Sequence, residues 1–276
     1  MSLTCFTEHN LFSKKQYLFD DSIIKYVEIP LHILNISSLN NMYNLGKNIK
    51  IVDNIFYLSI SSYIADLITA LFHCYQIDRH FFGKKNGYID ETKKKIIMNT
   101  SCGYASCHHI FPSNWKDIDD KIILQDIFIL LTPFFILNHF NPNEKNAYLN
   151  YSILYQILIS GLTHKYAHER NHNRYVPEVI KILQDLGLAL SSKNHKAHHE
   201  ELTCNYALLN GLSDPFANLL IKGLDNLFNI KPYEETIDLC EKYVKAYGDD
   251  IIIQFIGDIE GEITVNLYNN ILKMKQ

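Results

Sequence analysis

The sequence lacks several patterns that assign a protein class directly. Its six cysteines include no CxxC pair, so it shows neither a zinc knuckle nor a dithiol redox motif. Reduced, mostly buried thiols are expected instead. The net charge is only −4, without the strongly basic balance of a nucleic-acid-binding protein. The first ten residues contain Glu8 and no apolar run, so no cleaved signal peptide is expected, and no internal repeat is visible.

Apolar residues, by contrast, make up 47% of the chain and gather in long runs. Residues 127–143 and 146–163 carry no charge, and 55–77 carry a single carboxylate, Asp66. Runs of this length are typical of membrane spans, and 29–46 form a weaker fourth candidate. The mean hydropathy of −0.09 is low for a multispanning protein, so hydropathy alone leaves membrane and soluble helical folds open.

The placement of basic residues favours the membrane. If the three strong runs are spans, residues 78–121 and the segment after 163 lie on the same side, and both are rich in Lys and Arg. The connection between the second and third runs carries only Lys145. This is the alternation of the positive-inside rule, and it places the dense histidine clusters on the cytosolic side.

The expected fold is therefore mainly α: a multispanning membrane bundle of about four spans, with cytosolic helices carrying a histidine-rich di-metal site. We assign residues 1–230 to this domain. Residues 231–276 are expected to form a small cytosolic α/β appendage, with a helix followed by a strand, a turn and a strand. Residues 191–193 are predicted as a loop. Four prolines are expected to mark helix starts or breaks: Pro112, Pro133, Pro177 and Pro215.

Six of the 13 histidines lie between residues 164 and 199. His164 and His168 are four apart, so on a helix both imidazoles share one face and can hold one metal. HxxHH at 195–199 gives a second such set. An HH pair and a histidine at the end of the 55–77 run complete the candidate ligands, which are His73, His108, His109, His164, His168, His195, His198 and His199.

Eight imidazoles are too many for one metal and suit two metals with about four ligands each. Imidazole binds zinc, copper, iron and nickel, so the residue type alone does not select the metal. An all-imidazole set at a membrane surface fits a di-iron, oxygen-activating centre, and zinc stays an alternative. Five histidines are expected to be ordinary polar residues: His9, His32, His80, His139 and His172.

Residues 162–215 resemble the lipid desaturase family that includes plasmanylethanolamine desaturase (the Kua and CarF type) and a related plant palmitoyl-phosphatidylglycerol desaturase. The resemblance rests on HKYAH at 164–168, Pro177, LQD at 183–185, HKAHH at 195–199, Asn205-Tyr206 and Gly211. Upstream, Ala65-Asp66 with His73 and the HHIFP of 108–112 are similar to further motifs of the family, so the resemblance covers about residues 55–220.

The resemblance implies a membrane-bound di-iron enzyme that uses O2 to introduce a double bond into a lipid chain, with all eight histidines as ligands. It implies an electron donor such as cytochrome b5, an ether phospholipid as substrate, the vinyl-ether bond of a plasmalogen as product, and an endoplasmic reticulum location. It also suggests that Asp185 and Asp66 orient ligand imidazoles, with Asp66 alternatively lining the lipid channel. Asn205 and Tyr206 are likewise expected to support the ligand imidazoles or to line the substrate channel.

Three other functions stay open. A fatty-acyl desaturase acting on a phospholipid would need the same histidines. A soluble helical zinc hydrolase would need a carboxylate beside them, for which Glu169, Glu200 and Glu201 are available. A membrane adaptor that keeps the fold without activity would form no O2-dependent product.

Overall fold

The computed structural model is dominated by helices. It describes residues 21–78, 87–99, 120–201, 203–230, 234–248, 252–256 and 261–264.

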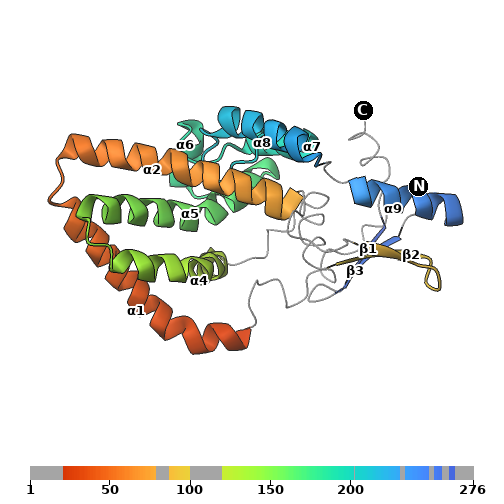
Figure 1. The fold of residues 1–276 in the computed structure, drawn as a ribbon, viewed down its shortest axis with the longest axis horizontal. Helices are drawn as coiled ribbons and strands as arrows, with labels where there is room; N and C mark the ends of the chain where they lie inside the picture. Colours follow the sequence, from red (N-terminus) through yellow and green to blue (C-terminus); the bar gives the residue numbers. More distant parts are fainter. Residues whose placement is uncertain are drawn as a thin grey trace.

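Long helices form a bundle in which α5 is central (Figure 1). α5 packs against α1, α2, α4 and α7, and α1 also contacts α4. The core of this bundle is apolar and aromatic. Phe135 is fully buried there, and the centroid of its ring lies 6.2 Å from that of Tyr151 and 5.1 Å from that of Tyr155. The helices are α1 (Asp21–Gly46), α2 (Ile51–Phe72), α4 (Asp120–His139) and α5 (Glu144–Asn171).

Asparagines build the short connection between α4 and α5. Asn143 caps α5, because its side-chain oxygen accepts a hydrogen bond from the Asn146 amide at 3.0 Å. Asn138 near the end of α4 donates to the carbonyl of Ala147 at 2.9 Å. These bonds fix the two helices as an antiparallel pair, and they leave the C-terminal half of α5 free to carry the first histidine cluster.

α2 is the helix best suited to cross a membrane. Ile51–Tyr75 extends over 25 residues with a mean hydropathy of 1.6, and within the described stretches no other helix is both long and apolar enough. The run 127–143 falls on α4, whose apolar part is Ile127–His139. The run 146–163 lies in α5, and 29–46 lies in α1. The arrangement of about four spans therefore stays a prediction.

At its C-terminal end α2 widens into a π-helix, η1 (His73–Asp78). Short π-helical turns are rare and occur frequently at functional sites. His73 stands at the junction, where its side chain is fully buried. The His73 side chain thus enters the protein interior at the point where the helix changes from α to π.

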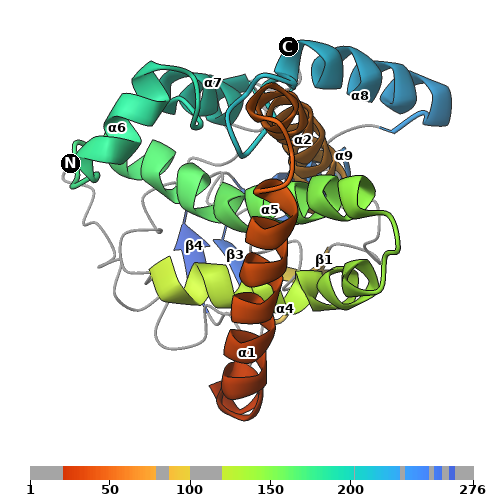
Figure 2. The ribbon, with the colours of Figure 1, turned by 90° about the vertical axis from the view of Figure 1, so that its left-hand side faces the viewer.

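Three shorter helices lie on one side of α2 and α5 (Figures 1 and 2). α8 packs on α2, where Ala217 and Ile221 join Ala70 and Cys74 in one apolar cluster. α7 packs on the C-terminal half of α5, and Asn171 of α5 donates to the Ser192 carbonyl at 2.8 Å. Their bounds are α6 (Glu178–Asp185), α7 (Ser192–Glu201) and α8 (Asp214–Phe228).

The prolines and the predicted loop have mixed outcomes. Pro177 precedes α6 and Pro215 lies in the first turn of α8, as predicted. The prediction for Pro133 is wrong, since this residue lies inside α4. Next to it, the Thr132 hydroxyl donates to the Phe128 carbonyl at 2.9 Å, and α4 packs along α5, so the helix continues through the proline. Pro112 lies outside the described residues.

The loop predicted over 191–193 is shorter in the structure, because α7 already begins at Ser192. The Ser191 hydroxyl caps this helix by accepting from the Asn194 amide at 3.4 Å.

A small mixed sheet brings the C-terminal segment back to the middle of the chain. Its order is β1-β2-β3-β4, with β1–β2 and β3–β4 antiparallel and β2–β3 parallel. α9 (Glu234–Tyr247) contacts the first two strands, and the Tyr243 hydroxyl donates to the Lys94 carbonyl. The strands are β1 (Gly87–Asp90), β2 (Lys95–Asn99), β3 (Ile252–Ile256) and β4 (Gly261–Thr264).

Two strands therefore occur where the sequence predicted them, but they share a sheet with residues 87–99. Such long-range pairing leaves no trace in local periodicity. The division of the chain at residue 230 stays a prediction.

Candidate metal centre

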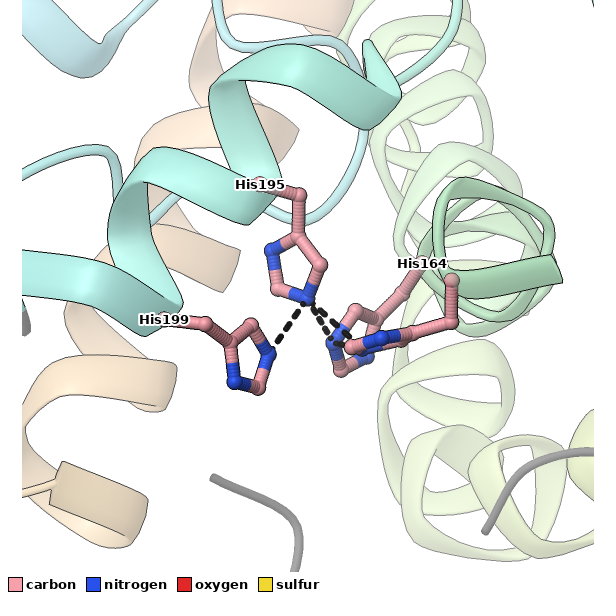
Figure 3. Close-up of side chains that lie close together, drawn as sticks. His164, His195 and His199 are labelled. Carbon is pink, nitrogen blue, oxygen red and sulfur yellow. Dashed lines mark hydrogen bonds between the residues drawn. The ribbon is translucent and has the colours of Figure 1, made fainter. Parts of the chain in front are cut away.

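Two helices supply the first part of the site. His164 and His168 lie one turn apart near the end of α5, and His195 and His199 lie one turn apart on α7. Because residues four apart share a helix face, packing α7 on α5 directs both pairs into the same space. Figure 3 shows the rings of His164 and His199 turned toward His195.

The four imidazoles meet through one nitrogen each. The Nε2 atom of His195 lies 2.9 Å from that of His164, 2.7 Å from that of His168 and 3.1 Å from that of His199. His164 and His168 are 3.2 Å apart at the same atoms. One ligand atom from each of the four residues lies within 4.8 Å of all the others.

Hydrogen bonding among the rings does not account for this convergence. A neutral imidazole nitrogen carries either one proton or one lone pair, so the Nε2 of His195 cannot form good hydrogen bonds to three other nitrogens at once. Nitrogens that bind one ion at about 2.0–2.1 Å are themselves separated by about 3.0–3.4 Å, which is close to the four Nε2–Nε2 distances of 2.7–3.2 Å given above. The donor set and its geometry fit a bound metal ion.

Burial keeps His195 in the form that a metal needs. His164, His168 and His195 are buried, and His199 is partly exposed. Burial lowers the pKa of His195 well below its ordinary value of 6.5, and repulsion from charge on His164 and on the other neighbouring rings lowers it further. At neutral pH this imidazole is therefore uncharged, and it offers a lone pair rather than a proton.

A second pair of histidines lies beside the four. His73 and His198 are both fully buried, with ring centroids 4.7 Å apart, and the His73 ring is 5.7 Å from that of His164. His73 Nδ1 is 3.1 Å from the Tyr206 carbonyl, and His198 Nδ1 is 2.7 Å from the Cys204 carbonyl. A carbonyl only accepts, so each Nδ1 must carry the proton, and Nε2 then carries the lone pair. Backbone carbonyls commonly prepare metal-binding histidines in this way.

Cys204 is close to the site but is poorly suited as a ligand. Its thiol donates to the Glu201 carboxylate at 3.6 Å, and burial together with that carboxylate raises the pKa of the thiol to about 11. Only the deprotonated thiolate binds metal strongly. The candidate ligands among the described residues are therefore imidazoles.

Comparison with protein families places this histidine cluster inside a known domain. A family model described as a lipid desaturase domain matches residues 62–221, which is more than half of the chain and includes all of the helices α6 and α7. The chain belongs to the lipid desaturase family. Comparison with curated proteins gave no match, and comparison with solved structures gave none.

Membership gives the histidine cluster a chemical context. The lipid desaturase family is membrane-associated, and its members are typically iron-dependent. The four-imidazole cluster is a set that could bind such a metal. The lipid desaturase domain implies an oxidoreductase that acts on lipid.

The remaining predicted residues of this lipid desaturase are placed as follows. His108 and His109 lie outside the described residues. The carboxylate of Asp185, at the end of α6, is 2.8 Å from the Arg170 guanidinium and about two-thirds exposed, so its partner here is a cation rather than an imidazole. Asn205 has a positive φ of 56° and donates from its backbone to the Asn218 side chain at 3.0 Å. Tyr206 is fully buried, with its ring 5.3 Å from that of His198.

Asp66 does not contact an imidazole in the described part of the lipid desaturase. It is fully buried on α2, and its carboxylate accepts hydrogen bonds from residues 209–213. Ser213 and Asp214, which help to hold the same loop, were not singled out from the sequence. Their position directly before Pro215 is a helix-start signal, but no local pattern links them to an acid 147 residues earlier.

Proposed function

We propose that this chain is a membrane-bound di-iron lipid desaturase that introduces a double bond into a lipid chain. The preferred substrate is an alkyl ether phospholipid, whose desaturation gives the vinyl ether of a plasmalogen. The observation that carries the proposal is the convergence of four imidazole Nε2 atoms from α5 and α7 inside a lipid desaturase domain.

The proposal assigns the histidines to two iron sites. The Nε2 atoms of His164, His168, His195 and His199 would hold one iron. His73 and His198, whose Nδ1 atoms face carbonyls, would hold the other together with His108 and His109. Bound iron would supply the O2-dependent removal of two hydrogen atoms from adjacent lipid carbons, with two further electrons and two protons completing the reduction of O2 to water.

The chain's own residues have three tasks in this reaction. Burial keeps the His195 imidazole neutral and excludes water from the centre. The carbonyls of Cys204 and Tyr206 hold two rings in one tautomer. The segment between α2 and α4 is rich in Lys and Arg, and this charge would complement that of an acidic electron donor such as cytochrome b5.

Exposed apolar surfaces support a membrane location. The outer face of α2 includes Ile51, Val52, Ile55 and Phe56, each more than half exposed. α6 and α8, which flank the histidine core, also expose large apolar side chains: Val179, Ile182, Leu186, Leu219, Leu227 and Phe228. Apolar surface of this extent is typical of contact with lipid. We propose a multi-pass protein of the endoplasmic reticulum with its histidines facing the cytosol.

The zinc hydrolase alternative finds less support. Its candidate carboxylates have other partners: Glu169 lies 3.5 Å from the Arg174 guanidinium, and Glu200 lies 3.7 Å from the Lys196 ammonium. Glu201 accepts from the Cys204 thiol. A general base must reach the water that it activates, and these contacts direct the three carboxylates elsewhere. A fatty-acyl desaturase acting on a phospholipid uses the same metal centre and is distinguished by its product alone.

The direct test is lipid mass spectrometry of cells that lack ether-lipid desaturation, with and without this chain. The proposal expects vinyl-ether phospholipids only in cells that express it. New double bonds confined to acyl chains would select the fatty-acyl alternative, and no desaturated product despite correctly inserted, iron-loaded protein would favour an inactive adaptor.

A matched pair of variants connects that product to the metal centre. His199→Ala removes one of the four converging nitrogens and should abolish the product. His139→Ala removes a histidine at the exposed end of α4, where its ring contacts the Asn41 amide at 2.8 Å, and should leave the product level unchanged. Equal loss in both variants would contradict the assignment of the site.

A further inference from the structure

The carboxylate of Asp66 organises a loop that is distant in sequence. Its Oδ1 accepts from three successive backbone amides, those of Leu209, Asn210 and Gly211, at 3.2, 2.9 and 3.2 Å. Its Oδ2 accepts from the Ser213 amide at 2.9 Å and from the Ser213 hydroxyl at 2.8 Å. A buried charge is costly unless it is satisfied, and these five donors satisfy both oxygens.

The same loop supplies the carbonyls that face two candidate ligands. Cys204 accepts from His198 Nδ1, and Tyr206 accepts from His73 Nδ1. Neither carbonyl belongs to a regular helix or strand, so no helical ladder holds it in place. Residues 204–206 are held in part by Asn205, whose backbone donates to the Asn218 side chain and whose side chain donates to the Asn194 carbonyl, and in part by how the following residues are held.

Further bonds connect the two ends of this loop. The Ala207 amide donates to the Asp214 carboxylate at 2.9 Å, and the Leu208 amide donates to the Thr69 hydroxyl at 3.4 Å. The Thr163 hydroxyl, next to His164, donates to the Leu208 carbonyl. The loop is thereby held between α2 and α5, with Asp66 as the acceptor that makes the most bonds to it.

We propose that Asp66 is a positioning residue for the metal centre. By holding residues 209–213, it places the carbonyls of Cys204 and Tyr206 so that His198 and His73 keep the proton on Nδ1 and direct Nε2 to the second metal. This inference rests on the proposed function, because it concerns the second of the two metal sites. It differs from direct orientation of an imidazole, since Asp66 acts through the backbone of a loop.

Asp66→Asn is the sharpest perturbation of this arrangement. The amide oxygen can replace Oδ1 and accept from the three successive amides, so much of the loop is retained. The amide nitrogen that replaces Oδ2 cannot accept from the Ser213 amide, so two buried N–H donors, that of Ser213 and that of the new side chain, face each other without an acceptor. The chain also offers a matched control: Asp53→Asn makes the same chemical change on the same helix at an exposed position.

The experiment is titration of the full-length, metal-free protein in detergent with Co²⁺, followed by visible absorption and metal analysis. Wild type and Asp53→Asn should bind two Co²⁺ per chain. Asp66→Asn should keep one Co²⁺ at the four-imidazole cluster, whereas the affinity for the second should fall about 10- to 100-fold, with loss of its absorption band. Ser213→Ala removes one of the five donors and should give a smaller change in the same direction.

Two outcomes would overturn the inference. Two Co²⁺ bound to Asp66→Asn with wild-type affinity and spectrum would show that the loop does not control the second site. Equal weakening of both sites, with a matching loss of thermal stability, would show a general structural role. The proposed function fails separately: wild-type protein that shows the two-site Co²⁺ pattern but forms no desaturated lipid would leave the positioning role intact.

Discussion

Gly211→Ala probes the loop whose carbonyls face His73 and His198. Gly211 has a φ of +83°, a conformation that an L-residue with a side chain adopts only with strain. A Cβ atom at this position would lie 3.1 Å from Oδ2 of Asp214 and 3.6 Å from the Asn194 amide nitrogen. Asp214 cannot move away freely, because its other oxygen accepts from the Ala207 amide.

The expected magnitude follows from these two contributions. The positive φ costs roughly 1–2 kcal/mol for a residue with a Cβ. Displacing Asp214 weakens a buried hydrogen bond worth about 1 kcal/mol. The free energy of unfolding should therefore fall by roughly 2–3 kcal/mol, which lowers Tm by roughly 3–6 °C in a chain of this size.

Two other glycines are controls for the separate contributions. Gly187 has a φ of +70° and no atom within 4 Å of an added Cβ, so Gly187→Ala should show only the conformational cost. Gly223 lies inside α8 in open space, and Gly223→Ala should raise the free energy of unfolding by about 0.5–1 kcal/mol. The assay is thermal unfolding of detergent-solubilised protein. A Tm for Gly211→Ala equal to or above that of Gly187→Ala would refute the packing argument.

Three further predictions concern charge. Because burial lowers the pKa of His195 below 6.5, the unfolded chain binds more protons at acidic pH than the folded chain does. The Tm of metal-free protein should therefore fall as pH drops below about 6.5, and a Tm that rises on acidification would contradict this. Burial raises the pKa of Asp214 from 3.8 to about 7, so the folded chain binds more protons than the unfolded chain between about pH 4 and pH 7, and the stabilising contribution of this group is lost as pH rises through that range. Asp214→Asn should therefore flatten the pH dependence of Tm between about pH 4 and pH 7, and an unchanged slope would count against it. Asp185→Asn breaks an exposed ion pair with Arg170 and should lower the free energy of unfolding by no more than about 1 kcal/mol. Its metal affinity should be unchanged. A tenfold weaker metal affinity would instead indicate that Asp185 orients an imidazole.

Local spacing was sufficient to predict part of the site. The HxxxH at 164–168 and the HxxHH at 195–199 each place imidazoles on one helix face, and both segments are helical in the structure. That the two faces meet is a tertiary fact, which the sequence suggested through the number of its clustered histidines and its resemblance to a family, not through local spacing. The division of the HxxHH motif is also tertiary: His195 and His199 join the α5 pair, whereas His198 lies beside His73.

The loop after α7 shows why the rest was not predictable. Asp66 was expected to orient an imidazole or to line a lipid channel, because a lone acid in an apolar run commonly has a functional role. Its partners are backbone amides more than 140 residues away, and backbone amides have no signature in the sequence. The parallel pairing of β2 with β3 was invisible for the same reason, since each strand is short and its partner is distant.

The most direct test of the central claim is X-ray absorption at the iron edge of the anaerobically loaded wild-type protein. We expect two irons per chain, ligand atoms that are mostly nitrogen, and the multiple-scattering pattern of several imidazoles on each metal. A shell containing sulfur, or one built mainly from carboxylate oxygen with at most one imidazole, would contradict the convergence of histidines on which the proposed function depends.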